Sequence, residues 1–252
     1  DYVQTHRPGT QNPRGWIQGA FYVGLTAFAE RTGDAGYLQA LRAHGVAQAW
    51  GLGKRPLHAD DHVIAQSWLW LHARDQDPAQ LAPVKARFDA ILADPPRADL
   101  TFIDGTEDQP CQARWCWSDA LFMAPPTWTA LSAATGDPRY AAYGDHEFWA
   151  ATDWLLDREH GLYFRDSRYF DRRDDQGRKI FWSRGNGWAY AGIVNILKTL
   201  PANHPSRPRY VALFKRMSAK LVALQKADGY WSVSLLAPEN SPPETSGTGF
   251  FV

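Results

Sequence analysis

The feature that most constrains the fold of this chain is a helical hairpin that recurs four times in 252 residues. Apolar residues recur at helical spacing in paired stretches, which cover residues 16–31 with 37–50, 60–74 with 77–92, 118–156, and 185–201 with 207–229. Short turns join the helices of a pair, and one pair cannot bury its apolar face alone. The pattern therefore predicts an all-α fold in which helix pairs stack on one another.

Turns and loops are distributed unevenly along the chain. Two hairpins share a turn sequence, TGDAGY and TGDPRY, in which Asp34 and Asp137 are placed to cap the following helix. The segments before each first helix are instead long and rich in Gly, Pro, Trp, Arg and Asp. Long loops on one rim of a helical scaffold favour a binding or catalytic site there. Within these loops, 161–170 and 230–236 are expected to form short strands or extended pieces.

A closed ring of such hairpins needs more helices than the eight that these stretches supply. The last residues, SGTGFFV, have the pattern of a helix that is beginning. We therefore expect residues 1–252 to form a single (α/α)-barrel domain, with the remaining C-terminal helices outside this sequence. The alternative, an open barrel, would expose the apolar faces of the terminal hairpins to water.

Composition excludes several function classes. Lys plus Arg equals Asp plus Glu at 27 each, so no field of one sign attracts nucleic acid or an anionic membrane. The chain has no apolar run long enough to span a membrane and starts with neither Met nor the apolar core of a signal peptide. Its two cysteines, Cys111 and Cys116, supply neither a disulfide framework nor a zinc site, and we interpret both as packing residues. Most of the 12 Trp are expected in the core, and a few in a sugar pocket.

The strongest candidate for chemistry is Asp119, in the segment CQARWCWSDALFM. One interpretation is structural: Ser118 caps a helix, and an acid in the first turn gains from the helix dipole. The other is catalytic. A carboxyl group among Trp115, Trp117 and Phe122 would have a pKa raised by burial, and could donate a proton and take one back.

A second acidic group lies in the segment HADDHVIAQ, where Asp60, Asp61 and His62 are adjacent. One aspartate is expected to be a helix cap. The other would point into the ring near Asp119 if the helix starts share a rim, and two acids in one cavity push their pKa values apart. Because no second histidine lies at ligand spacing, we do not expect a metal site here.

The string FWSRGNGW offers groups that suit a sugar acid. Its two glycines permit a tight turn around Asn186, which would gather Trp182, Arg184 and Trp188. The structural alternative is a loop that enters a helix, with the tryptophans in the core. Functionally, an Arg fork matches a carboxylate and a Trp face matches a sugar ring. Arg165 and Arg168 are weaker candidates of the same kind, since they can form local ion pairs.

As a set, these strings resemble family 105 glycoside hydrolases, the unsaturated rhamnogalacturonyl hydrolases, and more distantly the unsaturated glucuronyl hydrolases of family 88. The matching strings span about residues 60–251 and are WSDALFMAPP, TGDPRY, FRDSRYF, FWSRGNGW, ADGYW and PETSGTGFF. The resemblance implies an (α/α)6 six-hairpin barrel without a metal or organic cofactor. It also implies hydrolysis by hydration of a C4=C5 double bond in a terminal unsaturated uronate.

The resemblance also assigns roles to residues. Asp119 corresponds to the catalytic acid/base and Asp61 to the second active-site aspartate. The expected substrate-binding residues are Trp117, Trp182, Arg184, Trp188, His62 and Arg165. Some family members carry a histidine shortly before the catalytic aspartate, and this chain has none there, so Gln112 or Arg114 would have to replace it.

The expected partner is a small oligosaccharide ending in an unsaturated uronate, most simply unsaturated galacturonyl-rhamnose from pectin. We expect a monomer or weak homo-oligomer in the cytoplasm, or in the periplasm if an N-terminal signal precedes this sequence. Architecture does not determine chemistry, so an inverting glycosidase, a sugar epimerase and a noncatalytic carbohydrate-binding scaffold remain alternatives.

Overall fold

The computed structural model describes residues 12–106, 109–239 and 241–252. Its α-helices are α2 (Trp16–Thr32), α3 (Ala35–Ala47), α4 (Ile64–Asp75), α5 (Pro78–Ala93), α6 (Ala120–Met123), α7 (Pro125–Thr135), α8 (Pro138–Leu155), α9 (Ser183–Thr199), α10 (Arg207–Leu224) and α11 (Thr245–Phe251). The 3-10 helices are η1 (Ala59–Asp61), η2 (Pro110–Arg114) and η3 (Ser167–Tyr169), and the strands are β1 (Leu156–Asp157) and β2 (Leu162–Tyr163).

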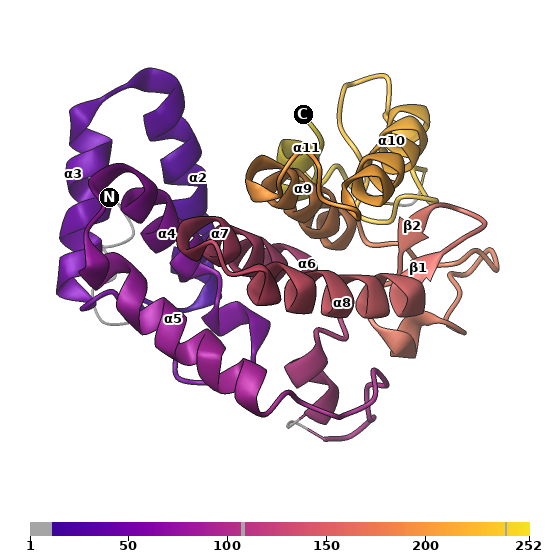
Figure 1. Cartoon of the computed structure of the whole chain (residues 1–252). Coiled ribbons are helices and arrows are strands. Elements are labelled where there is room, and N and C mark those ends of the chain that lie inside the picture. The colour runs from indigo at the N-terminus through magenta and orange to yellow at the C-terminus, as the bar shows by residue number, and fades with distance from the viewer. Residues whose placement is uncertain (1–11, 107–108, 240) are drawn as a thin grey trace.

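The four predicted hairpins are confirmed as α2–α3, α4–α5, α7–α8 and α9–α10. Helices α2, α4, α7, α9 and α11 contact one another in that order and form an inner row. Helices α3, α5, α8 and α10 pack outside their partners. In Figure 1 the two rows curve into an arc that is open between α2 and the α9–α11 side. All first helices therefore begin on the same rim.

The predicted helix caps are present. The carboxylate of Asp34 accepts a hydrogen bond from the Gly36 N–H at 2.7 Å, and that of Asp137 accepts one from the Arg139 N–H at 3.0 Å. In the same turns, Gly33 ends α2 with φ 69° and Gly136 ends α7 with φ 73°. Only glycine adopts this conformation without strain, which explains the repeated TGD sequence.

The core is largely aromatic. Trp68, Trp115 and Trp128 are fully buried with Phe88 in the cluster between the first three hairpins. Most tryptophans are core residues, as predicted from composition. On α2, by contrast, Ile17, Phe21 and Phe28 are exposed along one helical face.

The prediction of short strands or extended pieces in residues 161–170 and 230–236 is partly confirmed. Strands β1 and β2 form a two-stranded antiparallel sheet, and β2 lies within 161–170. Residues 230–236 make only isolated bridges, from Ser234 to Trp182 and from Ser232 to Pro243. Among the described residues, no helix is long and apolar enough to cross a membrane.

The interpretation of the cysteines as packing residues was wrong in one respect. Cys111 and Cys116 are buried, but they are joined in a disulfide bond. The turn of η2 between them brings their Cα atoms to 5.5 Å, within the range that a disulfide spans. The bond closes the loop that contains Gln112 and Trp115 and precedes Asp119 in the chain.

Candidate active site

Asp119 lies immediately before the short helix α6 on the rim where the inner helices begin. Its Oδ2 accepts a hydrogen bond from the Ser118 hydroxyl at 3.0 Å, and its side chain makes no helix-cap bond. The Ser118 N–H donates to the Arg165 carbonyl at 2.9 Å, which ties this segment to the one after β2. The structural alternative, in which Ser118 caps the helix, is therefore not supported, because the Ser118 hydroxyl bonds Asp119 instead.

The surroundings of Asp119 raise its pKa. Burial among Trp117, Phe122 and neighbouring residues disfavours the charged carboxylate, which is the largest effect. The Ser118 hydrogen bond and the positive charges of Arg165 and Arg184 act in the opposite direction, and burial outweighs them. The group thus holds its proton to a higher pH than an exposed aspartate does.

Asp60, rather than Asp61, lies beside Asp119. Helix η1, which contains Asp60, contacts α6. The pKa of Asp60 is raised to about 7, chiefly by burial and also by the negative charges of Asp119 and Asp61, against the lowering effect of Arg55. The charges of Asp60 and Asp119 therefore interact, so the two groups titrate as a coupled pair.

The contacts of Asp61 indicate a structural role. Its carboxylate accepts hydrogen bonds from the Arg55 backbone N–H at 2.7 Å and from the Arg55 Nε at 3.0 Å. It is buried against Gly53, where a side chain would collide with it. Asp61 was expected to be the second active-site aspartate, and the geometry favours Asp60 instead. Adjacent residues on a 3-10 turn point in different directions, which the sequence could not resolve.

His62 does not reach the site, contrary to the expected role in substrate binding. It is buried, its Nε2 bonds the Pro56 carbonyl at 2.7 Å, and its ring packs on Phe88. Burial lowers its pKa to about 4, so it is a neutral core histidine. Position 62 falls just after η1, where its side chain turns away from the rim.

His58, which sequence reasoning missed, contacts Trp117 of the Asp119 segment, where no histidine precedes the aspartate in the sequence. Its ring centroid is 5.0 Å from that of Trp117, and its Nδ1 accepts a hydrogen bond from the Asp60 N–H at 3.2 Å. Burial lowers its pKa to about 4, and Gln112 bonds its side chain. The only sequence signal was its position two residues before Asp60.

The FWSRGNGW string is partly structural and partly on the rim. Asn186 holds Tyr163 of β2 through its main chain, accepting from the N–H at 2.8 Å and donating to the carbonyl at 3.0 Å. Trp188 is buried against Phe122, with the ring centroids 4.9 Å apart. The sequence left two alternatives open for Trp188, a place in the core and a place in the binding site. Both occur, since Trp188 is a core residue that also borders the site.

Arg184 and Trp182 lie together at the start of α9. The Arg184 guanidinium is 4.2 Å from the Trp182 ring centroid and donates to Glu244 at 3.0 Å. Arg165 pairs with the fully buried Asp166, which Arg168 also contacts at 2.8 Å. Both Arg184 and Arg165 influence Asp119, whereas Arg168 stacks on Phe102, with its guanidinium 4.4 Å from the ring centroid.

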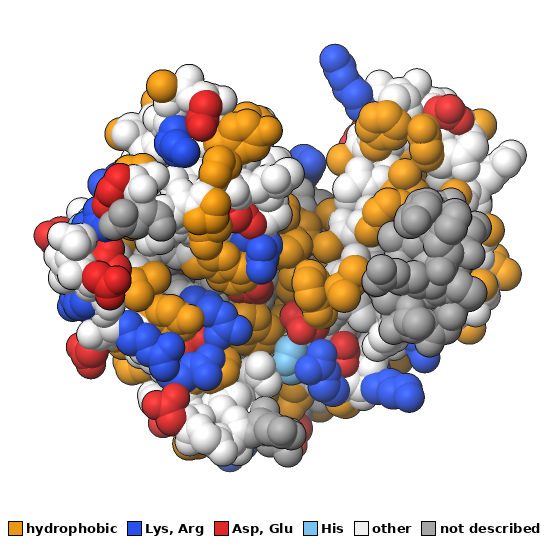
Figure 2. All heavy atoms as spheres, turned by 180° about the vertical axis from the view of Figure 1, so that it is seen from behind, with side chains coloured by type: hydrophobic (Ala, Val, Ile, Leu, Met, Phe, Trp, Pro, Cys, Tyr) orange, Lys and Arg blue, Asp and Glu red, His pale blue; other side chains and the backbone are white. Residues whose placement is uncertain are grey.

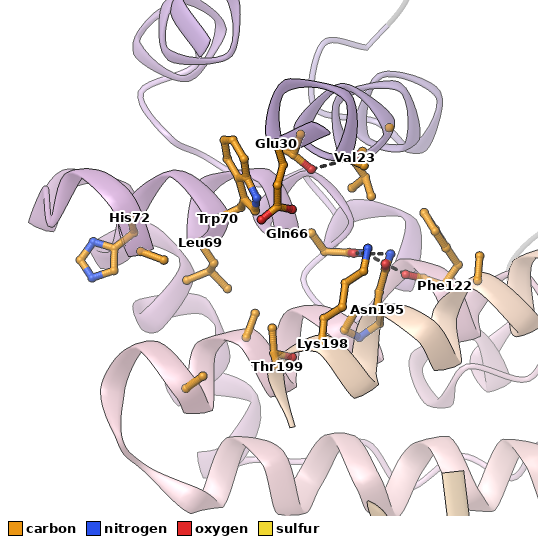
Figure 3. Close-up of a pocket in the computed structure, with 18 of the residues that line it drawn as sticks. Val23, Glu30, Gln66, Leu69, Trp70, His72, Phe122, Asn195, Lys198 and Thr199 are labelled. Carbon is orange, nitrogen blue, oxygen red and sulfur yellow. Dashed lines mark hydrogen bonds between the residues drawn. The ribbon is translucent and has the colours of Figure 1, made fainter. Parts of the chain in front are cut away.

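A hollow with a volume of about 940 Å³ lies inside the open arc. Glu30, Gln66, Asn195 and Lys198 project into it, as Figure 3 shows. It shares Phe122 and Trp188 with the rim, but neither Asp119 nor Asp60 lines it. Figure 2 shows the same hollow from behind, with charged side chains gathered below it. We place the chemistry at the rim, because the coupled carboxyl groups are there.

Comparison with known proteins decides the family. A family model described as Glycosyl Hydrolase Family 88 matches residues 2–252. The chain belongs to glycosyl hydrolase family 88. A solved structure named glycosyl hydrolase family 88 from Bacteroides vulgatus has a TM-score of 0.83 and 28% identity, over 99% of this chain and 74% of that one. The expected all-α barrel architecture and the resemblance to the family 88 and 105 enzymes are confirmed.

Two further relatives of this family 88 protein bear on its reaction. An Alteromonas sp. protein named unsaturated 3S-rhamnoglycuronyl hydrolase is 45% identical over 99% of this chain. A solved structure named as a polysaccharide lyase has a TM-score of 0.86 and 28% identity, over 99% of this chain and 72% of that one. The chain spans 63% of the length of the Alteromonas relative. One name describes a hydrolase and the other a lyase.

Proposed function

We propose that this family 88 protein removes a terminal 4,5-unsaturated uronate from oligosaccharides by hydrating its C4=C5 double bond. The observation that carries the proposal is Asp119, a partly buried carboxyl group with a raised pKa beside a second carboxyl group, Asp60. Arginines on the same rim can hold the uronate carboxylate. The name of the Alteromonas relative supports the same substrate class.

The proposed reaction begins with a proton transfer from Asp119 to C4. The double bond is an enol ether, because C5 bears the ring oxygen, and protonation leaves a cation at C5 that this oxygen stabilises. Water then adds to C5 while the Asp119 carboxylate takes one of its protons. The resulting hemiketal opens to an α-keto acid, and the hemiacetal left at C1 releases the neighbouring sugar. One water molecule is consumed, and Asp119 ends protonated as it began.

The neighbouring residues support this cycle in separate ways. Asp60 adds a second ionisable carboxyl group that interacts electrostatically with Asp119. Arg184 and Arg165 would orient the uronate carboxylate, and Trp182 offers a ring face beside Arg184. Ordinary glycosidases instead need two carboxyl groups on opposite sides of the anomeric bond.

The direction of an absorbance change tests the proposal against the lyase alternative. The full-length protein, mixed with an unsaturated disaccharide, should remove the absorbance of the conjugated double bond and release an α-keto acid. A polysaccharide lyase would create that absorbance from an intact polymer. In heavy-oxygen water, hydration places the label on C5, whereas an ordinary glycosidase or an epimerase does not. Absorbance that rises on polymer and never falls on disaccharide would refute the proposal.

The sugar next to the uronate is proposed from the relatives. The expected galacturonyl-rhamnose substrate and the Alteromonas name share rhamnose. We therefore propose rhamnose in this position. Oligomeric state and cellular compartment stay predictions.

We also propose that further helices complete the ring outside these 252 residues. The exposed apolar face of α2, formed by Ile17, Phe21 and Phe28, supports this, as does the greater length of the Alteromonas relative. Such a face is costly to leave in water. A longer version of the protein that includes these helices should bind less of a hydrophobic dye than residues 1–252 alone, and equal binding would refute this proposal.

A further inference from the structure

His58 lies between the two acidic segments of the site. It is buried and caps η1, because its Nδ1 accepts a hydrogen bond from the Asp60 N–H at 3.2 Å. Its ring also packs on Trp117, two residues before Asp119, with the ring centroids 5.0 Å apart. One imidazole therefore contacts both the turn that carries Asp60 and the segment that carries Asp119.

Gln112 fixes the tautomer of this imidazole. The Nδ1 of His58 can accept from the Asp60 N–H only while it carries no proton, so the neutral ring has its proton on Nε2. The Gln112 side chain bonds the same ring, and the Gln112 oxygen is therefore the acceptor for the Nε2–H. Gln112 lies in η2, within the loop that the Cys111–Cys116 disulfide closes. The acceptor is thus presented by a covalently closed loop.

We propose that His58 is a positioning residue for Asp60, held in one neutral tautomer by Gln112. The inference rests on the proposed function and deepens it by naming the residues that orient the second carboxyl group of the site. The bond from the Asp60 N–H to His58 fixes the first turn of η1, and with it the direction in which the Asp60 side chain leaves the backbone. Without an acceptor for this N–H, the turn loses its cap and Asp60 loses its fixed place beside Asp119.

Protonation of His58 would break this arrangement. A proton on Nδ1 converts the acceptor into a donor, and the Asp60 Oδ2, 3.8 Å away, would then attract the ring. Burial is the main reason that the pKa of His58 lies at about 4, and the positive charge of Arg55 lowers it as well, against the negative charge of Asp61. The other ionisable groups near His58 are Asp60 and the neutral His62. The accepting form of His58 therefore persists throughout the neutral range.

Three substitutions of His58 distinguish positioning from packing. The measured quantities are kcat and KM of the full-length protein on an unsaturated uronyl disaccharide. His58→Ala should lower kcat about tenfold or more with little change in KM, because the Asp60 N–H loses its acceptor. His58→Asn should restore most of this loss, since an Asn side chain accepts the same bond as a helix cap. His58→Phe fills the space beside Trp117 but accepts no hydrogen bond, and its kcat should stay as low as that of His58→Ala.

The pH profile of kcat/KM tests the contact with Gln112. A carboxylate in place of the Gln112 amide favours the protonated form of His58, so Gln112→Glu should move the acid limb up by about one pH unit or more. The same substitution made together with His58→Asn should leave the acid limb where it is. Gln109 offers a matched control, because its side chain holds only the preceding loop, through the Ile103 N–H at 2.8 Å and the Ile103 carbonyl at 2.7 Å. Gln109→Glu should lower stability without moving the acid limb.

Two sets of results would overturn the inference while the proposed function stands. The first is a kcat of His58→Asn as low as that of His58→Ala, or a kcat of His58→Phe equal to that of wild type. The second is an acid limb that does not move in Gln112→Glu, or that moves equally in the presence and absence of His58. A wild-type protein that leaves the double bond of the disaccharide intact would overturn both the inference and the proposed function.

Discussion

The Ser118 hydroxyl donates a hydrogen bond to the Asp119 Oδ2 at 3.0 Å, at the point where α6 begins and η1 and the start of α9 meet. On the α9 side, a side chain added at Gly185 would lie 2.8 Å from the Ser118 oxygen. The Asp119 carboxyl group is thus held by Ser118, which is itself enclosed by η1 and the start of α9. This arrangement positions one proton on the rim.

Replacement of Asp119 by Asn should abolish turnover. The amide keeps the shape and the Ser118 contact but cannot deliver a proton, so we expect a loss of about a thousand-fold or more in kcat. Helical circular dichroism and the unfolding midpoint should stay at wild-type values or rise, since a buried ionisable group is removed. Activity within about tenfold of wild type in this variant would contradict the assignment.

Substitution of Asp60 and substitution of Asp61 should have different effects on kcat and on stability. Asp60→Asn should lower kcat with little loss of stability. Asp61→Asn should lower the free energy of unfolding by roughly 1–3 kcal/mol, because it weakens a buried carboxylate–Arg55 pair. Kinetics and urea unfolding of both variants check the distinction, and the opposite pattern would restore Asp61 as the active-site residue.

The pH dependence of stability follows from the raised pKa of Asp60. In the folded protein this group keeps its proton up to about pH 7, whereas in the unfolded chain it ionises near the ordinary aspartate pKa of 3.8. The native state binds more protons between these values, so this contribution to stability is fully present below about pH 4 and falls as pH rises toward 7. Asp60→Asn should flatten this decline, as urea unfolding at a series of pH values would show.

The same carboxyl pair should shape the activity profile. Because Asp119 must be protonated to act, kcat/KM should fall on the alkaline side as Asp119 loses its proton. The alkaline midpoint should shift in Asp60→Asn, since Asp60 and Asp119 interact electrostatically and the substitution removes one of the two interacting charges. A pH profile of kcat/KM in Asp60→Asn that is identical to the wild-type profile would argue against coupling between Asp60 and Asp119.

The Cys111–Cys116 disulfide should stabilise the loop before Asp119. For so short a loop, the loss of chain entropy in the unfolded state gives about 2 kcal/mol. The double alanine variant should therefore unfold at lower urea, and its kcat should fall more than that of a surface variant of equal stability, because Trp117 and Gln112 lose their support. Reducing agent should lower the unfolding midpoint of wild type and leave the double variant unaffected.

A tight contact between α9 and α6 should matter for activity. A Cβ at Gly192 would collide with the Leu121 carbonyl oxygen, so Gly192→Ala should push α6, and Asp119 with it, out of place. We expect loss of both stability and kcat. At Gly24 on α2, a Cβ would meet no other atom within 4 Å, and Gly24→Ala should stabilise the helix by about 0.5–1 kcal/mol without a kinetic effect. Thermal unfolding and kinetics of the two variants test this.

The hairpins, their caps and the importance of the Asp119 segment could be predicted from the chain alone. Helical periodicity, the TGD turns and the acid that follows Trp117 are local features, and each depends on residues within one or two helical turns. The family strings were equally readable, because they are contiguous.

The choices within the site required the tertiary structure. Asp60 and Asp61, like His58 and His62, are close in sequence, and only the tertiary structure shows that Asp60 interacts with Asp119 and that His58 contacts Trp117. The pairing of Arg184 with Glu244 joins segments sixty residues apart. Charge coupling and ion pairing act through space rather than along the chain, so sequence determined which groups are present and the fold decided which of them meet.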